Sequence, residues 1–377
     1  MSLMNKLARI YQNAFSLLAT VCLPTRKALI SISSAVDPLS SDCIEIVRTI
    51  QGADPALPVT LIIHVEAANL HIQRSGRTII VKKGSMRSIF YALTSRVSIV
   101  THGLRDIGPF VNLKTVVINV WHGAPIKKIG YHSKATLGRE RLKNISRAWD
   151  YLVVPSAAWV TLFSEAFGLS EERLLSIGYP RYNSVPPRLA QRGERQFVKV
   201  AYLPTYRAGI SSFAVYDFLR DPAFIRFLDA NEVEFKVRFH PADRACEEGI
   251  PAALLCPKEA TTEQLIAQCD LLVTDCSSVI VDAAAIGIDT SLYFPDFAQV
   301  EECLGGFYHD FPGKDFHDGG AELSMEHIIS QFLRSGAGNY YLPPRLIPRR
   351  DFSESFLSIL PAIQERSAVA LPSLWSR

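Results

Sequence analysis

The chain has 377 residues, of which 48% are hydrophobic and 20% are charged, so it can bury a sizeable core, and two domains are more economical than one. A formal net charge of +3 is too small to indicate a nucleic-acid partner, and no basic tract interleaved with aromatic residues points to one. The seven cysteines include no CxxC pair, which argues against a disulfide framework and against a structural zinc site; a reducing cytoplasm fits this cysteine usage best.

Residues 1–27 are predicted to form an N-terminal amphipathic helix. The charged residues of this stretch are all basic, and the first acidic residue of the chain is Asp37. Apolar side chains recur at helical spacing at Met4, Leu7, Tyr11, Phe15 and Leu18. The segment is too polar to span a bilayer and lacks a signal-peptidase site. Two interpretations remain open, namely a first helix packed on the core and a basic helix lying on an anionic membrane surface.

From residue 28 onward, short apolar runs alternate with longer helical stretches. The first series of predicted strands is 28–33, 59–65, 78–82, 97–101, 115–120 and 151–156, and the second is 199–205, 235–240, 270–275 and 290–294. Continuous apolar runs are typical of strands that are covered on both faces, which predicts parallel sheets flanked by helices.

The stretch between the two series, residues 179–196, is rich in proline and charge and reads as a linker. We therefore expect an α/β protein with two doubly wound domains that face one another across a cleft. The N-terminal domain spans residues 28–185, and the C-terminal domain spans residues 195–377 and includes the C-terminal helices.

Four predicted strand ends carry unusual chemistry, and in doubly wound sheets ligands bind beyond the carboxyl ends of the strands. These ends are WHG (121–123), PTYR (204–207), RFHP (238–241) and TDCSS (274–278). Their occurrence at the same end of both sheets is stronger evidence for a site than any one of them alone.

The first of these ends places His122 after a strand and Gly123 beside it, where a ligand can approach the backbone closely. His122 alone could be an ordinary turn histidine, and Lys127 and Lys128 could belong to a solvated helix face. Across residues 122–147, however, seven lysines and arginines accompany a single acidic residue, Glu140, which favours a polyanionic acceptor.

The other ends also allow two interpretations. His240 and Pro241 could merely terminate a strand. Ser277 or Ser278 could be a helix N-cap, but the same position is a ready anion site, where backbone N–H groups and the helix dipole converge. No P-loop lysine follows, which disfavours a nucleoside triphosphatase of that class.

Six motifs together resemble a known family. In chain order they are WHGAPIKKIG, GYPRYN, AYLPTYR, RFHP, TDCSSVIVDAA and GGFYHDF. This ordered set is similar to the CDP-glycerol glycerophosphotransferase family, the teichoic acid primases and polymerases of cell-envelope synthesis, over roughly residues 88–310. The chain departs from the family pattern at Ala124, Tyr182 and Tyr206.

The resemblance implies two Rossmann-like domains of the glycosyltransferase B type. It also implies a transferase that moves a polyol phosphate from a CDP-polyol to an acceptor hydroxyl and releases CMP, with glycerol phosphate as the leading candidate for the transferred group. The acceptor would be lipid-linked or a growing polymer, and the product a teichoic-acid-like or capsular surface polymer. We expect no tightly bound cofactor, no metal and no nucleic acid, and a cytoplasmic protein held peripherally on the inner face of the cell membrane.

The resemblance also suggests roles for individual residues. His122 is the expected general base, because an imidazole with a pKa near ~6.5 is largely neutral at cytoplasmic pH. His240 is the second catalytic candidate and approaches the diphosphate. The acceptor-binding candidates are Gly123, Lys127 and Lys128. The candidates for binding the diphosphate or nucleotide are Thr205, Arg207, Arg238, Asp275, Ser277, Ser278 and Asp282. Of these, Asp275 and Asp282 are expected to orient neighbours or the nucleotide.

Two other functions remain open. One is a glycosyltransferase of the same fold that uses a UDP- or CMP-sugar, against which the pair WHG and RFHP argues. The other is a non-catalytic envelope-assembly protein, against which the presence of both candidate histidines argues.

Overall fold

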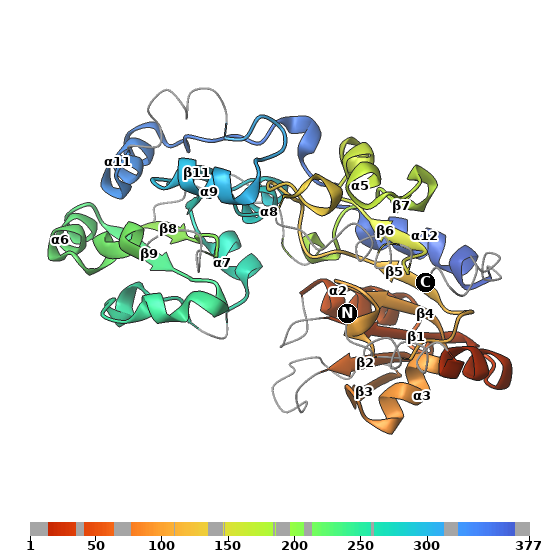
Figure 1. Ribbon diagram of the computed structural model, residues 1–377. Coiled ribbons are helices and arrows are strands. Elements are labelled where there is room, and N and C mark those ends of the chain that lie inside the picture. The colour runs from red at the N-terminus through yellow and green to blue at the C-terminus, as the bar shows by residue number, and fades with distance from the viewer. Residues whose placement is uncertain are drawn as a thin grey trace, which may run out of the picture. The chain divides into compact units, whose positions relative to one another are not determined.

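The computed structural model describes residues 14–34, 41–63, 77–108, 110–134, 146, 148–183, 185, 197–206, 213–257, 260–312 and 323–365. The chain divides into two compact α/β units (Figure 1). Unit 1 comprises Met1–His122, Gly138–Ser184 and Arg349–Arg377, and unit 2 comprises Gly123–Leu137 and Val185–Pro348. The chain therefore changes unit four times.

Unit 1 is built on a parallel sheet of seven strands in the order β3-β2-β1-β4-β5-β6-β7. The strands are β1 (Arg26–Ser33), β2 (Val59–Ile63), β3 (Thr78–Lys82), β4 (Ser95–Val100), β5 (Val116–Asn119), β6 (Tyr151–Val153) and β7 (Leu174–Leu175). The strand order reverses between β1 and β4, so the carboxyl ends of these two strands mark the switch point at which doubly wound sheets bind ligands.

The helices of unit 1 are α2 (Ser41–Ala53), α3 (Met86–Thr94), α5 (Val160–Phe167) and α12 (Phe352–Glu365), and residues 14–22 are also helical. α12 buries Phe352, Phe356, Leu360 and Ile363, which lie on one helical face. It packs against α2, β1 and β4. The expectation that the C-terminal helices belong to the second domain is therefore wrong for α12, because its apolar stripe completes the core of unit 1.

Unit 2 contains a smaller parallel sheet in the order β11-β10-β8-β9. Its strands are β8 (Val198–Tyr202), β9 (Val233–Val237), β10 (Leu271–Thr274) and β11 (Asp289–Leu292). Its helices are α6 (Pro222–Ala230), α7 (Thr262–Gln268), α8 (Val279–Ile286), α9 (Phe297–Leu304) and α11 (Met325–Ser335). Here the switch point lies between β8 and β10.

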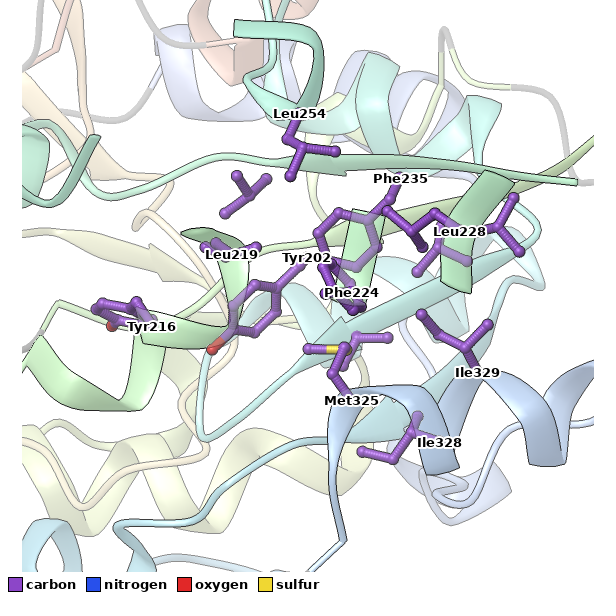
Figure 2. Close-up of a cluster of buried hydrophobic side chains, with 14 of the residues drawn as sticks. Tyr202, Tyr216, Leu219, Phe224, Leu228, Phe235, Leu254, Met325, Ile328 and Ile329 are labelled. Atoms are coloured by element: carbon purple, nitrogen blue, oxygen red, sulfur yellow. The ribbon is translucent and has the colours of Figure 1, made fainter. Parts of the chain in front are cut away.

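Both faces of the unit 2 sheet are covered near the end of β8, although β8, β9 and β11 also contain polar or charged residues. Tyr202 of β8 joins a cluster with Phe224 of α6 and Met325 of α11 (Figure 2). The adjacent residue, Ala201, points to the opposite face and joins a second cluster with Ile266 of α7. Successive side chains of a strand alternate between faces, so consecutive residues of a strand that is covered on both sides are both buried.

The predicted strands are all present, and their parallel pairing is confirmed. The two-residue strand β7 was not predicted. The expected linker begins later than residue 179, since Pro180–Tyr182 forms a buried 3₁₀ turn of unit 1, η6. The predicted N-terminal domain also included residues 123–137, which belong to unit 2 instead.

Candidate functional site

The turn that follows β5 is strained in a way that orients its side chains. Asn119 accepts a hydrogen bond through its side-chain oxygen from the Trp121 backbone N–H, at 2.7 Å. Trp121 has a φ of 59°, a left-handed conformation that bulky residues rarely adopt. Its indole packs against the aromatic rings of Trp149, Phe163 and Phe167, which anchor the turn. Such strain persists where surrounding structure enforces it, and it is concentrated at functional sites.

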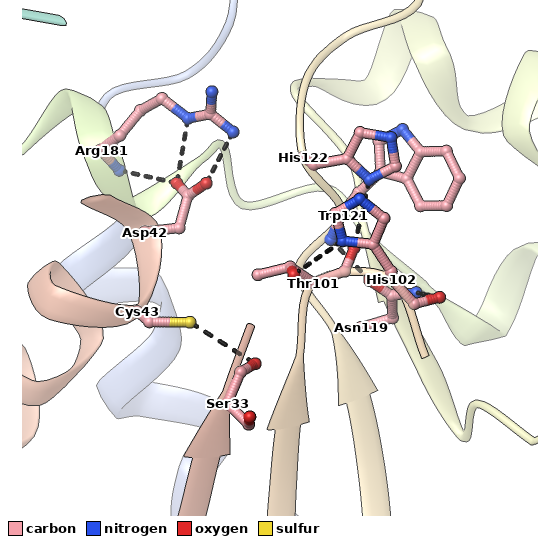
Figure 3. Close-up of polar contacts among 9 residues, drawn as sticks. All are labelled: Ser33, Asp42, Cys43, Thr101, His102, Asn119, Trp121, His122 and Arg181. Atoms are coloured by element: carbon pink, nitrogen blue, oxygen red, sulfur yellow. Dashed lines mark hydrogen bonds and ion pairs between the residues drawn. The ribbon is translucent and has the colours of Figure 1, made fainter. Parts of the chain in front are cut away.

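The imidazole of His122 lies beside that of His102, which follows β4 (Figure 3). The two rings are stacked with a centroid separation of 4.0 Å and an interplanar angle of 6°. The Nδ1 of His122 lies 3.3 Å from the carbonyl oxygen of Thr101. Because a carbonyl can only accept, Nδ1 carries the proton in this contact, and Nε2 holds the lone pair of the neutral ring.

Asp106 holds the Thr101–His102 backbone in place. Its buried carboxylate accepts hydrogen bonds from the backbone N–H groups of Thr101 and His102, each at 2.9 Å. The hydroxyl of Thr101 also lies 2.9 Å from Nδ1 of His102. The carbonyl that orients His122 and the ring that stacks on it are therefore fixed by one acidic residue.

The surroundings of His122 lower its pKa to about 3. The largest cause is loss of hydration, because the rings of His102 and Trp121 lie against the imidazole, although the residue is exposed. The charges of His102 and of the Arg181 guanidinium add to the effect. Loss of hydration also lowers the pKa of His102, against an opposing effect of Asp106. His122 is consequently neutral near pH 7, as a proton acceptor has to be.

Arg181 and Asp42 form a buried ion pair in unit 1 (Figure 3). The Asp42 carboxylate accepts from the Arg181 backbone N–H and Nε, each at 3.1 Å, and from a terminal guanidinium nitrogen at 2.6 Å. Asp42 lies in the first turn of α2, where a negative charge is favourable. The pair therefore ties η6, which contains part of the GYPRYN motif, to the start of α2.

In unit 2, Asp275 joins the two loops at the switch point. It follows β10, is fully buried, and accepts hydrogen bonds from the backbone N–H of Thr205, at 2.9 and 3.1 Å, and from the Thr205 hydroxyl. Thr205 follows β8. Asp275 thus orients a neighbour, which is one of the two roles that the sequence left open.

Ser278 is the N-cap residue of α8, but its side chain makes no capping hydrogen bond. The Ser277 hydroxyl instead accepts from the Val279 backbone N–H at 3.5 Å. Asp282 lies in the first turn of α8 and is buried. The start of α8 therefore places two hydroxyls next to helix N–H groups, with one carboxylate already in the first turn.

Gly123 lies directly against this helix start. A Cβ added to Gly123 would be 2.8 Å from Ser278 Oγ and 3.2 Å from Ser278 Cβ, and the glycine has a φ of +149°. Any residue other than glycine would therefore place its Cβ against Ser278 and would also strain the backbone at this position. The structure brings together Gly123 and Ser278, which the sequence had assigned to different domains.

His240 and Arg238 follow β9 and differ in their surroundings. His240 is exposed, and its ring lies 5.2 Å from that of Tyr206, centroid to centroid. Arg238 is half-buried and donates to the Ala260 carbonyl through one guanidinium nitrogen. Arg207, the remaining candidate of this group, lies outside the described residues.

Lys127 and Lys128 belong to unit 2, so the prediction that placed them in the N-terminal domain is wrong. The physical reason is backbone pairing with the GGFYHDF motif. The N–H of Lys128 donates to the Gly306 carbonyl at 3.2 Å, and the N–H of Tyr308 donates to the Ile126 carbonyl at 2.9 Å. The absence of a side chain at Gly306 leaves room for the Lys128 ammonium.

The same segment is held further by the Tyr308 hydroxyl. This hydroxyl accepts from the Ile129 backbone N–H at 3.1 Å and lies 2.9 Å from Nδ1 of His132. Both lysines remain half-exposed on this fixed backbone. Within the described part of the chain, no group of three or more His, Cys, Asp or Glu side chains is arranged to hold a metal ion.

Sequence reasoning missed three contributors, namely His102, Asp106 and the Asp42–Arg181 pair. His102 follows a predicted strand, as His122 does, so the strand-end rule could have found it. Asp42 and Arg181 are 139 residues apart, so no local sequence pattern could predict that they form an ion pair.

Two doubly wound units with polar side chains at their strand ends define a ligand-binding α/β protein of the Rossmann-like kind. A family model described as CDP-Glycerol:Poly(glycerophosphate) glycerophosphotransferase matches residues 16–318. Since this is most of the chain, the protein belongs to that family, and the resemblance read from the sequence is confirmed.

Curated relatives match shorter regions. A teichoic acid glycerol-phosphate transferase of Staphylococcus aureus is 28% identical over 116 residues, which are 25% of this chain and 29% of that protein. A teichoic acid glycerol-phosphate primase of Bacillus subtilis is 29% identical over 105 residues, which are 25% and 28% of the two chains. A teichoic acid poly(glycerol phosphate) polymerase of Bacillus spizizenii is 23% identical over 224 residues, 52% of this chain and 56% of the polymerase. The chain therefore matches less than two thirds of the length of each of these relatives.

Solved structures support the fold. A variant of the wall teichoic acid polymerase TagF, soaked with CDPG, has a TM-score of 0.68 at 17% identity and covers 95% of this chain and 92% of its own. A putative UDP-N-acetylglucosamine 2-epimerase from Listeria monocytogenes has a TM-score of 0.52 at 12% identity, covering 89% and 96%. At these identities the likeness concerns the fold alone, and it agrees with the two Rossmann-like domains predicted from the sequence.

Proposed function

We propose that this protein transfers a polyol phosphate from a CDP-polyol to an acceptor hydroxyl and releases CMP. Glycerol phosphate is the leading candidate for the group that is transferred. Family membership over residues 16–318 supports the reaction class. The observation within the site that carries the proposal is the neutral His122, whose Nδ1 is engaged by a carbonyl and whose Nε2 is the basic nitrogen.

In the proposed reaction, the acceptor hydroxyl attacks the phosphorus that bears the polyol. A new P–O bond forms to the acceptor oxygen, the P–O bond to the CMP phosphate breaks, and CMP leaves with the bonding electrons. The acceptor proton passes to Nε2 of His122, which acts as the general base. The stacked His102 and the Thr101 carbonyl keep the imidazole in the required orientation and tautomer.

The donor diphosphate is assigned to unit 2. The N–H groups at the start of α8 and the hydroxyls of Ser277 and Ser278 can hydrogen-bond phosphate oxygens. His240 and the part of the Arg238 guanidinium not bound to Ala260 supply further donors, and Arg207 is retained as a candidate from the sequence. Thr205 and Asp275 hold the loop after β8 in place, because the Asp275 carboxylate accepts hydrogen bonds from the backbone N–H and the hydroxyl of Thr205. Asp282 is assigned to orientation of the helix start or the nucleotide.

Binding of the acceptor is assigned to Gly123, Lys127 and Lys128. The two ammonium groups are half-exposed on a backbone that is held by Gly306 and Tyr308, so they can attract the phosphate of a lipid-linked or polymeric acceptor at little ordering cost. The product is a teichoic-acid-like or capsular surface polymer. The reaction as proposed needs neither a tightly bound cofactor nor a metal.

We also propose a cytoplasmic location, peripheral on the inner face of the cell membrane. Across the described residues, no helix combines the length and the apolar character needed to cross a bilayer. Peripheral attachment would bring the enzyme to an acceptor that is anchored in lipid.

The decisive experiment incubates purified protein with CDP-glycerol, CDP-ribitol and UDP-sugars, each with a glycerol-phosphate primer, and measures release of CMP or UDP. We expect CMP release that depends on both the CDP-polyol and the primer. Release of UDP from a UDP-sugar would instead identify a glycosyltransferase. No nucleotide release from any donor would favour a non-catalytic envelope-assembly role.

A further inference from the structure

A short antiparallel ladder joins two segments of unit 2 and separates two neighbouring lysines. Lys127 lies opposite Phe307 in an antiparallel bridge, and Lys128 donates its backbone N–H to the Gly306 carbonyl at 3.2 Å. Successive side chains of an extended segment point to opposite faces. Lys127 and Lys128 therefore start on opposite faces of the ladder, and each of them can meet a different phosphate of an acceptor chain.

Two consecutive glycines leave their side-chain space to lysines. A Cβ added at Gly306 would lie 3.3 Å from the ammonium nitrogen of Lys128, and a Cβ added at Gly305 would lie 2.8 Å from Cγ of Lys134. Lys134 comes six residues after Lys128 in the sequence, yet its stem lies over the adjacent glycine. Gly305 is also the C-cap of α9, where the helix dipole favours cations. The fold therefore brings Lys128 and Lys134 to neighbouring positions at the end of this helix.

Tyr308 fixes the loop between these two lysines. Its hydroxyl accepts from the Ile129 backbone N–H at 3.1 Å and lies 2.9 Å from Nδ1 of His132. The rings of Tyr308 and His132 also meet edge to face, with their centroids 5.8 Å apart. His132 ends the 3₁₀ turn η3 (Gly130–His132), so both the backbone and one ring of the loop are held. An anion that binds to such a loop has little additional chain to order.

The described residues leave the charges of Lys128 and Lys134 uncompensated. Lys128 is half-exposed and Lys134 is exposed. Within the described part of the chain, neither ammonium group forms an ion pair. Cations that are held side by side without a counter-charge attract anionic ligands.

We propose that Lys128 and Lys134 form a second phosphate-binding position for the acceptor, separate from Lys127. The site then prefers an acceptor chain with two or more phosphates to one with a single phosphate. Tyr308 is a positioning residue, because it holds the loop that carries both lysines. The inference deepens the proposed function and rests on it for the identity of the ligand, a chain of glycerol phosphate units.

The test measures binding of synthetic glycerol phosphate oligomers with one and with three phosphates to the full chain, by calorimetry and without donor nucleotide. The test variant is Lys134→Gln, which removes the charge and keeps the part of the stem that lies over Gly305. The matched control is Lys199→Gln. Lys199 lies near the start of β8 in unit 2, at the opposite end of the strand from the candidate site, and pairs with Glu234 at 3.6 Å. Circular dichroism confirms folding.

We expect the parent and Lys199→Gln to bind the three-phosphate oligomer about fivefold more tightly than the single-phosphate compound. Lys134→Gln should reduce this preference to about twofold or less, with a smaller effect at high salt, because the contact is electrostatic. Tyr308→Phe should weaken binding of the longer oligomer about threefold through loss of preorganisation. In transfer assays, Lys134→Gln should raise KM for the longer primer and leave kcat near the parental value, as expected for a contact made equally in the ground state and the transition state.

Equal affinity of the parent for the two oligomers would overturn the proposal. Equal losses in Lys134→Gln and Lys199→Gln would also overturn it, since they would show only an effect of net charge. Parental binding by Tyr308→Phe would remove the positioning role of Tyr308. Because the binding measurement contains no donor, length-dependent binding without transfer from CDP-glycerol would contradict the proposed function alone, whereas transfer without length dependence would contradict this second position alone.

Discussion

The protonation of His122 offers the sharpest test of the site. With a pKa of about 3, its imidazole is neutral throughout the physiological range. At pH 5 such a group is about 1% protonated, whereas an unperturbed histidine with a pKa near 6.5 is about 97% protonated. The two cases therefore differ almost completely at a pH that the folded protein can be expected to tolerate.

The assay is NMR titration of ¹³C-labelled histidine rings, with the His122 signal assigned through its loss in His122→Asn. We expect the His122 shifts to stay constant from pH 8 to pH 5. His102→Ala should raise the pKa of His122, because it uncovers one face of the ring and removes a like charge. His102→Phe keeps the stacked surface and removes only the charge, so it should produce the smaller rise.

The sign of the linked stability effect also follows. The folded pKa lies below the unfolded value, so the unfolded chain takes up this proton first as the pH falls. His122 therefore favours the folded state above about pH 6.5 and does so progressively less between pH 6.5 and pH 3.

Binding of CDP-glycerol should raise the pKa of His122, since a diphosphate near the ring stabilises the imidazolium. This matters for catalysis, because a base with a pKa of about 3 accepts a proton poorly until the anionic donor is bound. A His122 signal that titrates near pH 6.5 in the free protein, or that does not respond to the donor, would refute this reasoning.

Three further predictions concern single side chains. His122→Ala and His122→Asn should each lower turnover by about 10² to 10⁴ while CDP-glycerol affinity, measured by calorimetry, stays near the parental value; near-parental turnover would remove His122 as the base. His240→Ala should weaken CDP-glycerol binding in the same assay, whereas the control His327→Ala, at an exposed position of α11, should not; equal affinity in both would move the donor site elsewhere. Gly123→Ala should destabilise the fold by about 1–3 kcal/mol through backbone strain, in addition to its clash with Ser278, and Ser278→Gly should restore only the part due to the clash; full recovery in thermal unfolding would show that φ at this position is unimportant.

The sheets could be predicted because burial on both faces favours runs of apolar residues, even though β8, β9 and β11 also contain polar or charged positions. β8 shows the cause directly, since Ala201 and Tyr202 pack in separate clusters on opposite faces. β7 lacked such a signal, because Leu174–Leu175 is too short to form a pattern.

The assignment of segments to units could not be predicted, because it depends on contacts between distant residues. The apolar stripe of α12 would suit the core of either unit. The segment that carries Lys127 and Lys128 pairs with Gly306 and Tyr308, roughly 180 residues later in the chain. The absence of side chains at Gly305 and Gly306 leaves room for Lys134 and Lys128, respectively, and this complementarity appears only when the two segments are placed together.

The candidate site was only partly predictable, for a related reason. His122 and His240 follow from the rule that ligands bind at the carboxyl ends of strands. What sets the chemistry of His122 is its environment, namely the stacked His102 and the loss of hydration. The expected pKa near ~6.5 was therefore wrong, although the conclusion that the ring is neutral holds more firmly.

The turn after β5 has to satisfy two requirements with consecutive residues. In unit 1, the left-handed Trp121 and its hydrogen bond to Asn119 direct the His122 imidazole onto His102. In unit 2, the next residue, Gly123, has to lie against Ser278 with no side chain of its own. Neither requirement stabilises the isolated turn, since one places a tryptophan in a strained conformation and the other accepts the entropy cost of glycine. Both neighbours of His122 therefore cost local stability, and what the turn gains is a fixed position for the imidazole against His102.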